Sequence, residues 1–369
     1  MNLGPRLRDA GTAESRAIPC PSDDGACRRN LWERERAQRA WTAPQSLRCL
    51  ARFRRAVSPL DRDAWLADPK QPAARYRSLM EVEGRNPESK EVLAARRQIS
   101  RRGWAADILR TQDPRGFWVH RDSLYVPKYV STNWRLLALA ELGLTADHPG
   151  VRRAIHLMLE DYGSTAGPLG GKKRGPHLCF TGNTARMMIL FGLGADPRVR
   201  ASLDWLAAQQ KEDGGWDCFG RKKGTLDGWE AMAAFAALGR RRWTRTWKAS
   251  VERGAEFYLE RGLLREGRTR YVPWERLHYP IHYYYDVLVG LETLQRLGYG
   301  DDPRLGPAKD LLRRKRRPDG TWPLEAVHPD LGRGANYDVD PGTRRFAMER
   351  VGAASRWITL RALSVLGLL

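Results

Sequence analysis

Three short segments with the same order of residues recur along the chain, and each ends in tryptophan. They read QDPRGFW at 112–118, QQKEDGGW at 209–216 and KRRPDGTW at 315–322. Each carries turn residues before the tryptophan, and glycine there allows backbone angles that other residues avoid. A stretch rich in Ala and Leu follows, at 134–142, 229–238 and 357–366. A repeated order of helix, turn, tryptophan and second helix predicts an array of helical hairpins.

The hydrophobic pattern predicts two kinds of helix that alternate along the chain. We expect a short helix at 61–80 and longer amphipathic helices at 88–111, 149–162, 197–210, 246–264 and 302–316. Shorter and more apolar helices are expected to begin near residues 133, 181, 227, 280 and 354. No strand is predicted. The alternation indicates an all-α fold in two layers, with inner helices surrounded by outer helices.

The first 60 residues differ from the rest of the chain. They contain twelve Arg and no Lys, with scattered Pro and Ser and a weak apolar pattern. We interpret 1–60 as a disordered basic extension, or as an extension from a start codon placed too far upstream. A basic arm that binds RNA or a membrane is the alternative. The repeat domain is predicted to span 61–369.

Charge and cysteine usage limit the partners and the compartment. Lys and Arg number 64 against 43 Asp and Glu, which gives a net charge of +21. No zinc-finger, helix-turn-helix or RNA-binding signature accompanies this charge, so we expect no specific nucleic-acid partner. Peripheral contact with an anionic membrane stays open. The five cysteines form no CxxC pair, and neither a signal peptide nor a membrane span is predicted, so we expect a cytoplasmic protein.

Residues 61–369 resemble the prenyltransferase and squalene-oxidase repeat superfamily, which includes squalene cyclases and the β subunits of protein prenyltransferases. The tryptophan segments carry the resemblance, together with WLADPKQPAARYRSL at 65–79, CFTGNTARMMILFGLG at 179–194, PIHYYYDVLVGLETLQRLGYG at 280–300 and MERVGAASRWITLRALSVL at 348–366. Short stand-alone repeat proteins of bacteria and archaea look most similar, a group that implies a fold and no particular reaction. The resemblance implies an α/α toroid, in which inner helices surround an apolar cavity.

The known reactions of this superfamily need motifs that the chain lacks. Cyclases of the squalene type use a DxDD acid, and the nearest string here is Asp338-Val339-Asp340-Pro341. Terpene synthases that ionise a diphosphate use DDxxD, and Asp301-Asp302-Pro303 lacks the third Asp. The family zinc site needs Asp, Cys and His, but Trp229 stands at the position of the Cys. We therefore expect no metal at the family positions. A zinc site rebuilt from Cys179, Cys218 and His282 is the alternative.

Polar residues at the starts of the inner helices are the remaining candidates for a site. Asp286 is the most unusual, because it lies in the apolar run YYYDVLVGL, where a lone carboxyl has a raised pKa and can act as an acid. A salt bridge from Asp286 to Arg186 or Arg356 is the structural alternative. The predicted catalytic residues are Asp286, Asp227 and His282. The predicted substrate-binding residues are Trp134, Asn183, Arg186, Trp229, Tyr284, Arg356 and Trp357.

These residues predict an apolar cavity for an isoprenoid or similar lipid-like ligand. One hypothesis is an enzyme that resembles terpenoid cyclases or prenyltransferases but uses a different acid. The other is a binding or scaffold toroid that has lost the chemistry of the superfamily. A centre lined by aromatic rings and open to a ligand favours the enzyme, whereas a centre filled by side chains favours the scaffold.

Overall fold

The computed structural model describes residues 61–163, 167–170, 175–266, 269–327 and 348–368. All of them belong to one compact unit, which spans Pro59–Leu369. The extension predicted for residues 1–60 lies outside the described residues, and so do Asp338 and Asp340.

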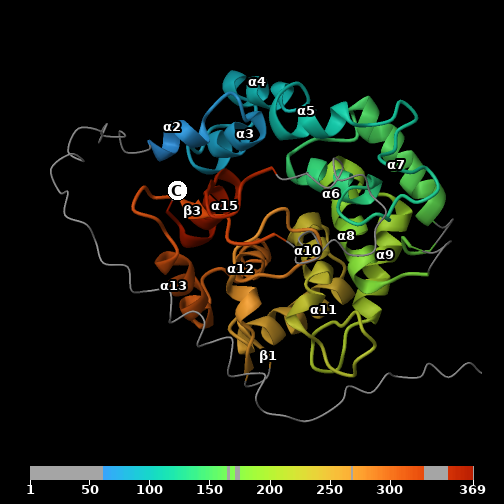
Figure 1. Cartoon of the computed structure of the whole chain (residues 1–369). Coiled ribbons are helices and arrows are strands. Elements are labelled where there is room, and N and C mark those ends of the chain that lie inside the picture. The colour runs from blue at the N-terminus through green and yellow to red at the C-terminus, as the bar shows by residue number, and fades with distance from the viewer. Residues whose placement is uncertain (1–60, 164–166, 171–174, 267–268, 328–347, 369) are drawn as a thin grey trace, which may run out of the picture. The chain divides into compact units, whose positions relative to one another are not determined.

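The most deeply buried helices lie around the centre of this unit (Figure 1). They are α6 (Thr132–Glu141), α8 (Leu178–Met188), α10 (Glu230–Leu238), α12 (Val287–Arg296) and α15 (Arg356–Leu366). Each packs against the next along this series, and α15 also contacts α3 (Pro72–Glu81). Helix α5 (Gly103–Arg110) contacts both α3 and α6, which closes the ring. The inner helices are apolar on most sides because other helices cover them on most sides.

A second layer of amphipathic helices surrounds the inner ring (Figure 1). It contains α2 (Arg62–Leu66), α4 (Lys90–Gln98), α5, α7 (Pro149–Tyr162), α9 (Pro197–Ala208), α11 (Arg245–Glu260) and α13 (Gly306–Arg314). Helices α7, α9, α11 and α13 pack against α6, α8, α10 and α12 respectively, so each forms a hairpin with an inner neighbour. The fold is all-α, in the toroidal two-layer arrangement that the repeats predict.

The loops between the helices contain short 3-10 or π segments and two small antiparallel strand pairs. The helical segments are η2 (Ile189–Leu193), η3 (Leu226–Gly228), η4 (Arg240–Arg242), η5 (Val272–Glu275) and η6 (Pro303–Leu305). Strand β1 (Arg265–Glu266) pairs with β2 (Thr269–Arg270), and β3 (Trp322–Pro323) pairs with β4 (Ala354–Ser355). The expectation of no strands is corrected by these two-residue pairs, which are too short for a sequence pattern to reveal. None of the described helices is both long and apolar enough to cross a membrane.

The recurring tryptophans hold the hairpins together. Trp118, Trp216 and Trp322 are buried, and each indole nitrogen donates to a backbone carbonyl ten residues earlier in the preceding outer helix. In the second tryptophan segment, Gln210 also contacts the next outer helix. Its side-chain amide donates a hydrogen bond of 2.8 Å to the carbonyl of Ser250 in α11. The indole bonds tie each turn to the end of its preceding helix, and the Gln210 bond ties α9 to α11.

Four predicted helices have the wrong limits. The single short helix expected over 61–80 is two helices, α2 and α3, and Pro72 opens the second one. The helix expected over 88–111 is interrupted between Gln98, where α4 ends, and Gly103, where α5 begins with a φ of +67°. Helix α8 begins at Leu178 and not at a cap near Thr181 or Asn183, both of which lie inside it. Helix α12 begins at Val287, seven residues after the expected Pro280, so the YYY run precedes the helix.

Candidate functional site

A cavity of about 590 Å³ opens at the end of the ring where α8 and α10 begin. Aromatic rings form much of its wall, and we call it the aromatic cavity. Its lining includes Tyr125, Tyr162, Phe180, Phe219, Tyr271, Trp274, Tyr283 and Tyr284. Its volume lies within the range of about 300–1,000 Å³ that is usual for small-molecule sites. The inner helix starts therefore surround a space large enough for a ligand.

The aromatic wall is held in place by contacts between its own rings. The Phe180 ring lies 5.5 Å from that of Tyr125 and 4.9 Å from that of Tyr162, centre to centre. Next to the β1–β2 hairpin, the Tyr271 ring packs edge-on against the Trp274 ring, with the ring centres 5.1 Å apart. Ring pairs of this kind restrict side-chain rotation, so the cavity wall is largely preformed. Burial also raises the pKa of Tyr284 to about 12, with smaller effects of Tyr271 and Asp227, so its hydroxyl stays protonated near neutral pH.

Glu230 is the most unusual polar residue in the wall of the aromatic cavity. It is the first residue of α10 and is fully buried, and no other described residue donates a hydrogen bond to either carboxylate oxygen. Burial raises its pKa well above the ordinary value, and the negative charges of Cys179 and Asp227 act in the same direction. A carboxyl group that is buried and unpaired strongly favours its protonated form.

Close helix packing brings Glu230 to this position. Gly182 of α8 faces α10, and a methyl group added there would lie 2.8 Å from Cβ of Glu230. Any larger residue would therefore push the two helices apart. Glycine at this point lets α10 approach α8, and it sets Glu230 beside the start of α8.

Asp227 also lines the aromatic cavity, as expected for an inner-helix start. One carboxylate oxygen accepts a hydrogen bond of 2.9 Å from the indole nitrogen of Trp274. Burial raises the pKa of Asp227, and this effect outweighs the opposing hydrogen bond from Trp274. Two acidic side chains with raised pKa values, Asp227 and Glu230, thus share one wall.

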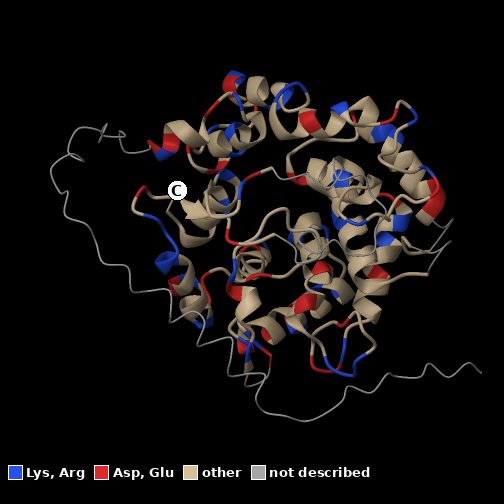
Figure 2. Ribbon diagram, viewed as in Figure 1, with Lys and Arg blue, Asp and Glu red and all other residues tan. Residues whose placement is uncertain are grey.

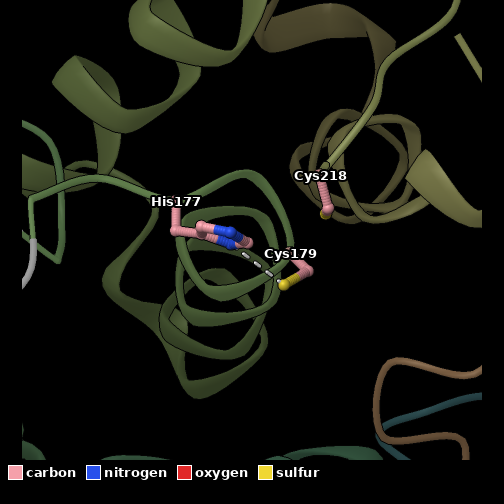
Figure 3. Close-up of side chains that lie close together, drawn as sticks. All are labelled: His177, Cys179 and Cys218. Atoms are coloured by element: carbon pink, nitrogen blue, oxygen red, sulfur yellow. Dashed lines mark hydrogen bonds between the residues drawn. The ribbon is translucent and has the colours of Figure 1, made fainter. Parts of the chain in front are cut away.

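A cluster of sulfur and nitrogen donors completes this wall (Figure 3). The potential ligand atoms of His177, Cys179 and Cys218 all lie within 4.8 Å of one another, and Cys179 Sγ lies 3.3 Å from His177 Nδ1. Both cysteines are free thiols. The pKa of Cys179 falls to about 5 because the Cys218 thiol donates a hydrogen bond to it, with a smaller contribution from His177. The same hydrogen bond raises the pKa of Cys218.

Local hydrogen bonds fix the two segments that carry these donors. His177 is the residue before α8, and its backbone N–H donates to Oγ1 of Thr181 at 3.2 Å. Cys218 lies in the loop after Trp216, where Asp217 accepts hydrogen bonds from the backbone N–H groups of Phe219 and Arg221. The donor cluster is therefore built from one helix start and one turn of defined shape.

The other end of the ring contains a smaller and charged cavity of about 90 Å³. Glu292 of α12 pairs there with Arg77 of α3 at 3.0 Å and with Arg361 of α15 at 2.6 Å. Arg186 pairs with Glu141 beside them. Arginine charges hold the pKa of Glu292 well below its usual value, although burial opposes them. Charged side chains thus fill the ring at this end, whereas aromatic rings surround an open space at the other.

The predicted substrate-binding residues are divided between these places. Tyr284 lines the aromatic cavity, whereas Arg186, Trp229 and Trp357 line the charged cavity. Arg356 points away from both, because it donates to the Trp65 carbonyl and to Asp68 and so anchors α2.

Trp134, Asn183 and His282 form a buried layer beneath the wall of the aromatic cavity. The His282 ring lies 5.4 Å from that of Trp134, and its carbonyl accepts a hydrogen bond of 3.2 Å from the Asn183 amide. The alternative zinc set named His282 together with the two cysteines. This choice of histidine is corrected, because the histidine that joins Cys179 and Cys218 is His177.

The expected raised pKa of Asp286 is wrong. Its side chain caps α12 by accepting from the N–H of Val289, and it contacts His278 at 2.6 Å. Burial alone would raise its pKa, but attraction to His278 and these hydrogen bonds outweigh burial, so the pKa is lowered. The expected salt bridges to Arg186 or Arg356 are not the ones formed, since His278 is the partner.

Sequence reasoning did not select Glu230, His177 and the two cysteines as the main site. The signals were present, because His177-Leu178-Cys179 puts two donors at a helix start and Cys218 directly follows a tryptophan segment. Their convergence depends on how α8 packs against α10, which no local pattern encodes.

No protein-family model and no curated protein matches the sequence. Among solved structures, the chain is similar to the type II terpene cyclase MstE from Scytonema. In its complex with the product merosterolic acid A the identity is 18%, the TM-score is 0.40, and the match covers 82% of this chain and 86% of that one. In its apo form a variant gives 19% identity and a TM-score of 0.41 over the same shares. A protein from Actinoplanes gives 17% and 0.39, over 81% of this chain and 89% of the other. The fold described above rests on the arrangement of the helices themselves.

Proposed function

We propose that the protein binds an isoprenoid or a similar lipid-like small molecule in the aromatic cavity and acts on it as an enzyme. One observation carries the proposal: a cavity of about 590 Å³ with an aromatic wall holds a buried carboxyl group that has no hydrogen-bond partner among the described residues. Aromatic rings supply apolar contact area and attract positive charge that develops on a ligand. An unpaired buried carboxyl is unfavourable for stability, so its retention is best explained by chemistry.

The raised pKa of Glu230 favours one kind of chemistry over another. Protonation of an isolated alkene, as in cyclases with a DxDD motif, needs an unusually strong acid. Glu230 is instead a weak acid, since burial stabilises its protonated form. Weak acids of this kind exchange protons with alcohols, thiols or water near neutral pH. We therefore favour a transfer reaction on a lipid-like ligand, closer to a prenyltransferase than to a proton-initiated cyclase.

Apolar and basic residues at the rim of the cavity fit delivery of the ligand from a membrane surface. Phe219 is 73% exposed, and Tyr271 and Val272 are about half exposed. Arg221, Lys222 and Lys223 are exposed in the same loop as Phe219. Exposed rings beside basic residues are typical of proteins that rest on an anionic lipid surface. Elsewhere, Lys and Arg occur on many elements and do not gather on one helix (Figure 2).

The test is ligand binding by the full chain. Lipid extracts of the purified protein are analysed by mass spectrometry, and geranylgeraniol and farnesol are titrated while tryptophan fluorescence is followed, since Trp274 lines the cavity. Phe180→Ala should weaken binding about five-fold, as expected for the loss of one aromatic contact of roughly 1 kcal/mol. Tyr76→Ala, in α3 outside the cavity lining, is the matched control and should bind normally.

The outcomes separate this proposal from its rivals. No saturable binding of either alcohol and no lipid in the extract would overturn it. Binding without any conversion of the ligand, unaffected by Glu230→Gln, would favour a toroid that only binds or carries its ligand. The other end of the ring is filled by charged side chains, and this observation favours the second candidate, a toroid without catalytic activity.

A further inference from the structure

We propose that His177, Cys179 and Cys218 bind one zinc ion in the wall of the aromatic cavity. The three residues come from the start of α8 and from the loop before α10, and all three line the cavity. Two thiolates and one imidazole form a typical zinc ligand set. The proposal rests on the proposed function only in sharing the same cavity, since metal binding is measured without any ligand.

The spacing of the donor atoms fits this ion. In a tetrahedral zinc site, bonds of about 2.3 Å to sulfur and about 2.0 Å to nitrogen place neighbouring ligand atoms roughly 3.5–3.8 Å apart. Cys179 Sγ and His177 Nδ1 are 3.3 Å apart, and all three donors lie within 4.8 Å of one another. Small rotations of the side chains bring them to the bonding distances. Only His177 is exposed, so zinc has an entry route while both sulfur atoms are partly covered.

The site offers three protein ligands and not four. Among the described residues, no carboxylate and no further His or Cys joins the cluster within 4.8 Å. Structural zinc sites are closed by four protein ligands, whereas catalytic sites have three and leave one position for an exchangeable ligand. The three donors line the cavity, so we infer that the fourth position faces the space proposed for the lipid-like ligand.

Glu230 supplies the second and independent observation. Its carboxylate lines the same cavity, is fully buried, and receives no hydrogen bond from any other described residue. A water or thiol on the fourth position of the zinc would donate the hydrogen bond that this carboxylate lacks. Buried unpaired acceptors call for such a partner, and carboxylates commonly orient the exchangeable ligand of catalytic zinc.

Metal analysis tests the inference directly. The full chain is purified without a metal-binding tag, and its zinc is measured by mass spectrometry with an inductively coupled plasma. We expect zinc in equimolar amount. Cys179→Ser and Cys218→Ser should each reduce it to background, whereas His156→Ala, at an exposed histidine of α7, should leave it unchanged. Glu230→Gln should also retain the zinc, because Glu230 is not a ligand.

Cobalt substitution gives a readout that does not depend on the stability of the variants. Cobalt added to wild-type protein freed of zinc should produce the thiolate charge-transfer band and the visible bands of a tetrahedral site. Added zinc should displace it and protect both thiols from alkylation. Circular dichroism shows whether the serine variants keep their helices.

Three results would overturn the inference. They are wild-type protein free of zinc after growth and reconstitution with zinc, a disulfide between Cys179 and Cys218 in freshly purified protein, and equimolar zinc in the double serine variant. Wild-type protein that contains no zinc but binds geranylgeraniol normally would refute the metal site alone. Equimolar zinc without binding of any lipid would refute only the proposed function.

Discussion

The imidazole Nδ1 of His278 lies 2.6 Å from a carboxylate oxygen of Asp286, and both side chains are fully buried. The same carboxylate accepts from the backbone N–H of His278 and from that of Val289, so it joins the loop before α12 to the first turn of that helix. These hydrogen bonds hold the loop and the helix together. The carboxylate therefore has a structural role, and its ionised form is the one that the protein stabilises.

We predict that Asp286→Asn destabilises the fold without changing ligand affinity. Asparagine can still cap the helix, but it loses the contact between a carboxylate and the His278 ring, at a cost of roughly 3 kcal/mol. Urea denaturation followed by circular dichroism measures the free energy of unfolding. Asp302→Asn is the matched control, since this half-buried cap in front of η6 pairs with Arg304 near the surface and should cost less than about 1 kcal/mol. Normal stability together with lost turnover would restore Asp286 as the catalytic acid.

The lowered pKa of Asp286 also predicts how stability depends on pH. A carboxyl with a folded-state pKa below its unfolded value of about 3.9 stabilises the protein above that value and loses this contribution as the pH falls through the folded-state pKa. His278 and Arg361 are the neighbours that favour ionisation of Asp286. The pKa of Glu292 is also lowered, so Glu292 adds a similar dependence on pH. The test therefore compares the free energy of unfolding of wild type with that of Asp286→Asn at each pH. This difference should be constant from pH 7 to about 5 and should shrink below about 4. A difference that grows on acidification would contradict the assignment.

Trp216 joins α9 to α11, and this predicts a large effect on stability. Its indole donates to the Leu206 carbonyl of α9 at 2.7 Å, and its ring packs against Gly254 of α11. We expect Trp216→Ala to lower the free energy of unfolding by about 3–5 kcal/mol, as for other buried aromatic residues. Gly254→Ala should also destabilise, because the added methyl would lie 2.8 Å from the ring. Denaturation curves measure both effects, and unchanged stability with lost ligand binding would reassign Trp216 to the site.

The repeats predicted the fold because the information is local. Each tryptophan segment carries its own turn residues, its own indole donor and an amphipathic helix before it, so the hairpins could be predicted individually. The predicted helix limits were wrong where a single residue sets the limit. The apolar pattern over 88–111 continues without interruption, whereas the backbone leaves the helix after Gln98 and resumes it at Gly103.

The candidate site was predicted less well because it depends on contacts between distant segments. Asp227 was identified from its place at a helix start, and it does line the cavity. Asp286 has the same kind of position, but His278 and the helix cap use its carboxylate fully. Glu230 is unusual because of its surroundings in the fold: Gly182 lets α8 approach it closely, and no described residue donates a hydrogen bond to its carboxylate.

We predict that Phe219 and Val272 anchor the protein to anionic lipid surfaces. Both side chains are more than half exposed, and an apolar side chain of this size contributes about 1.5–3 kcal/mol when it leaves water. The double variant Phe219→Glu/Val272→Glu should therefore bind vesicles containing phosphatidylglycerol at least about ten-fold more weakly, as measured by flotation. Val351→Glu is the control, since Val351 is exposed and does not line the cavity. Equal binding of all variants would exclude this rim as the contact surface.

Glu230→Gln should make the protein more stable at neutral pH. The wild-type carboxylate is buried and has no hydrogen-bond partner among the described residues, and Cys179 and Asp227 oppose its ionisation more than Arg186 favours it. Glutamine keeps the shape without the charge, so we expect a gain of about 1–2 kcal/mol at pH 8. Glu266→Gln, at the neighbouring β1, is the control and should change stability by less than about 0.5 kcal/mol.

The sign of this effect with pH distinguishes a raised pKa from other causes. A group with a raised folded-state pKa stabilises the protein fully below its unfolded value, about 4.3 for Glu, and loses this contribution as the pH rises through the folded-state pKa. The advantage of Glu230→Gln should therefore be small near pH 4 and should grow toward pH 8. Urea denaturation in the presence of a chelator, across this pH range, measures it without interference from metal. An advantage that does not vary with pH would mean that Glu230 does not titrate in this range, and a loss of stability would mean that its carboxylate has a partner in the folded protein.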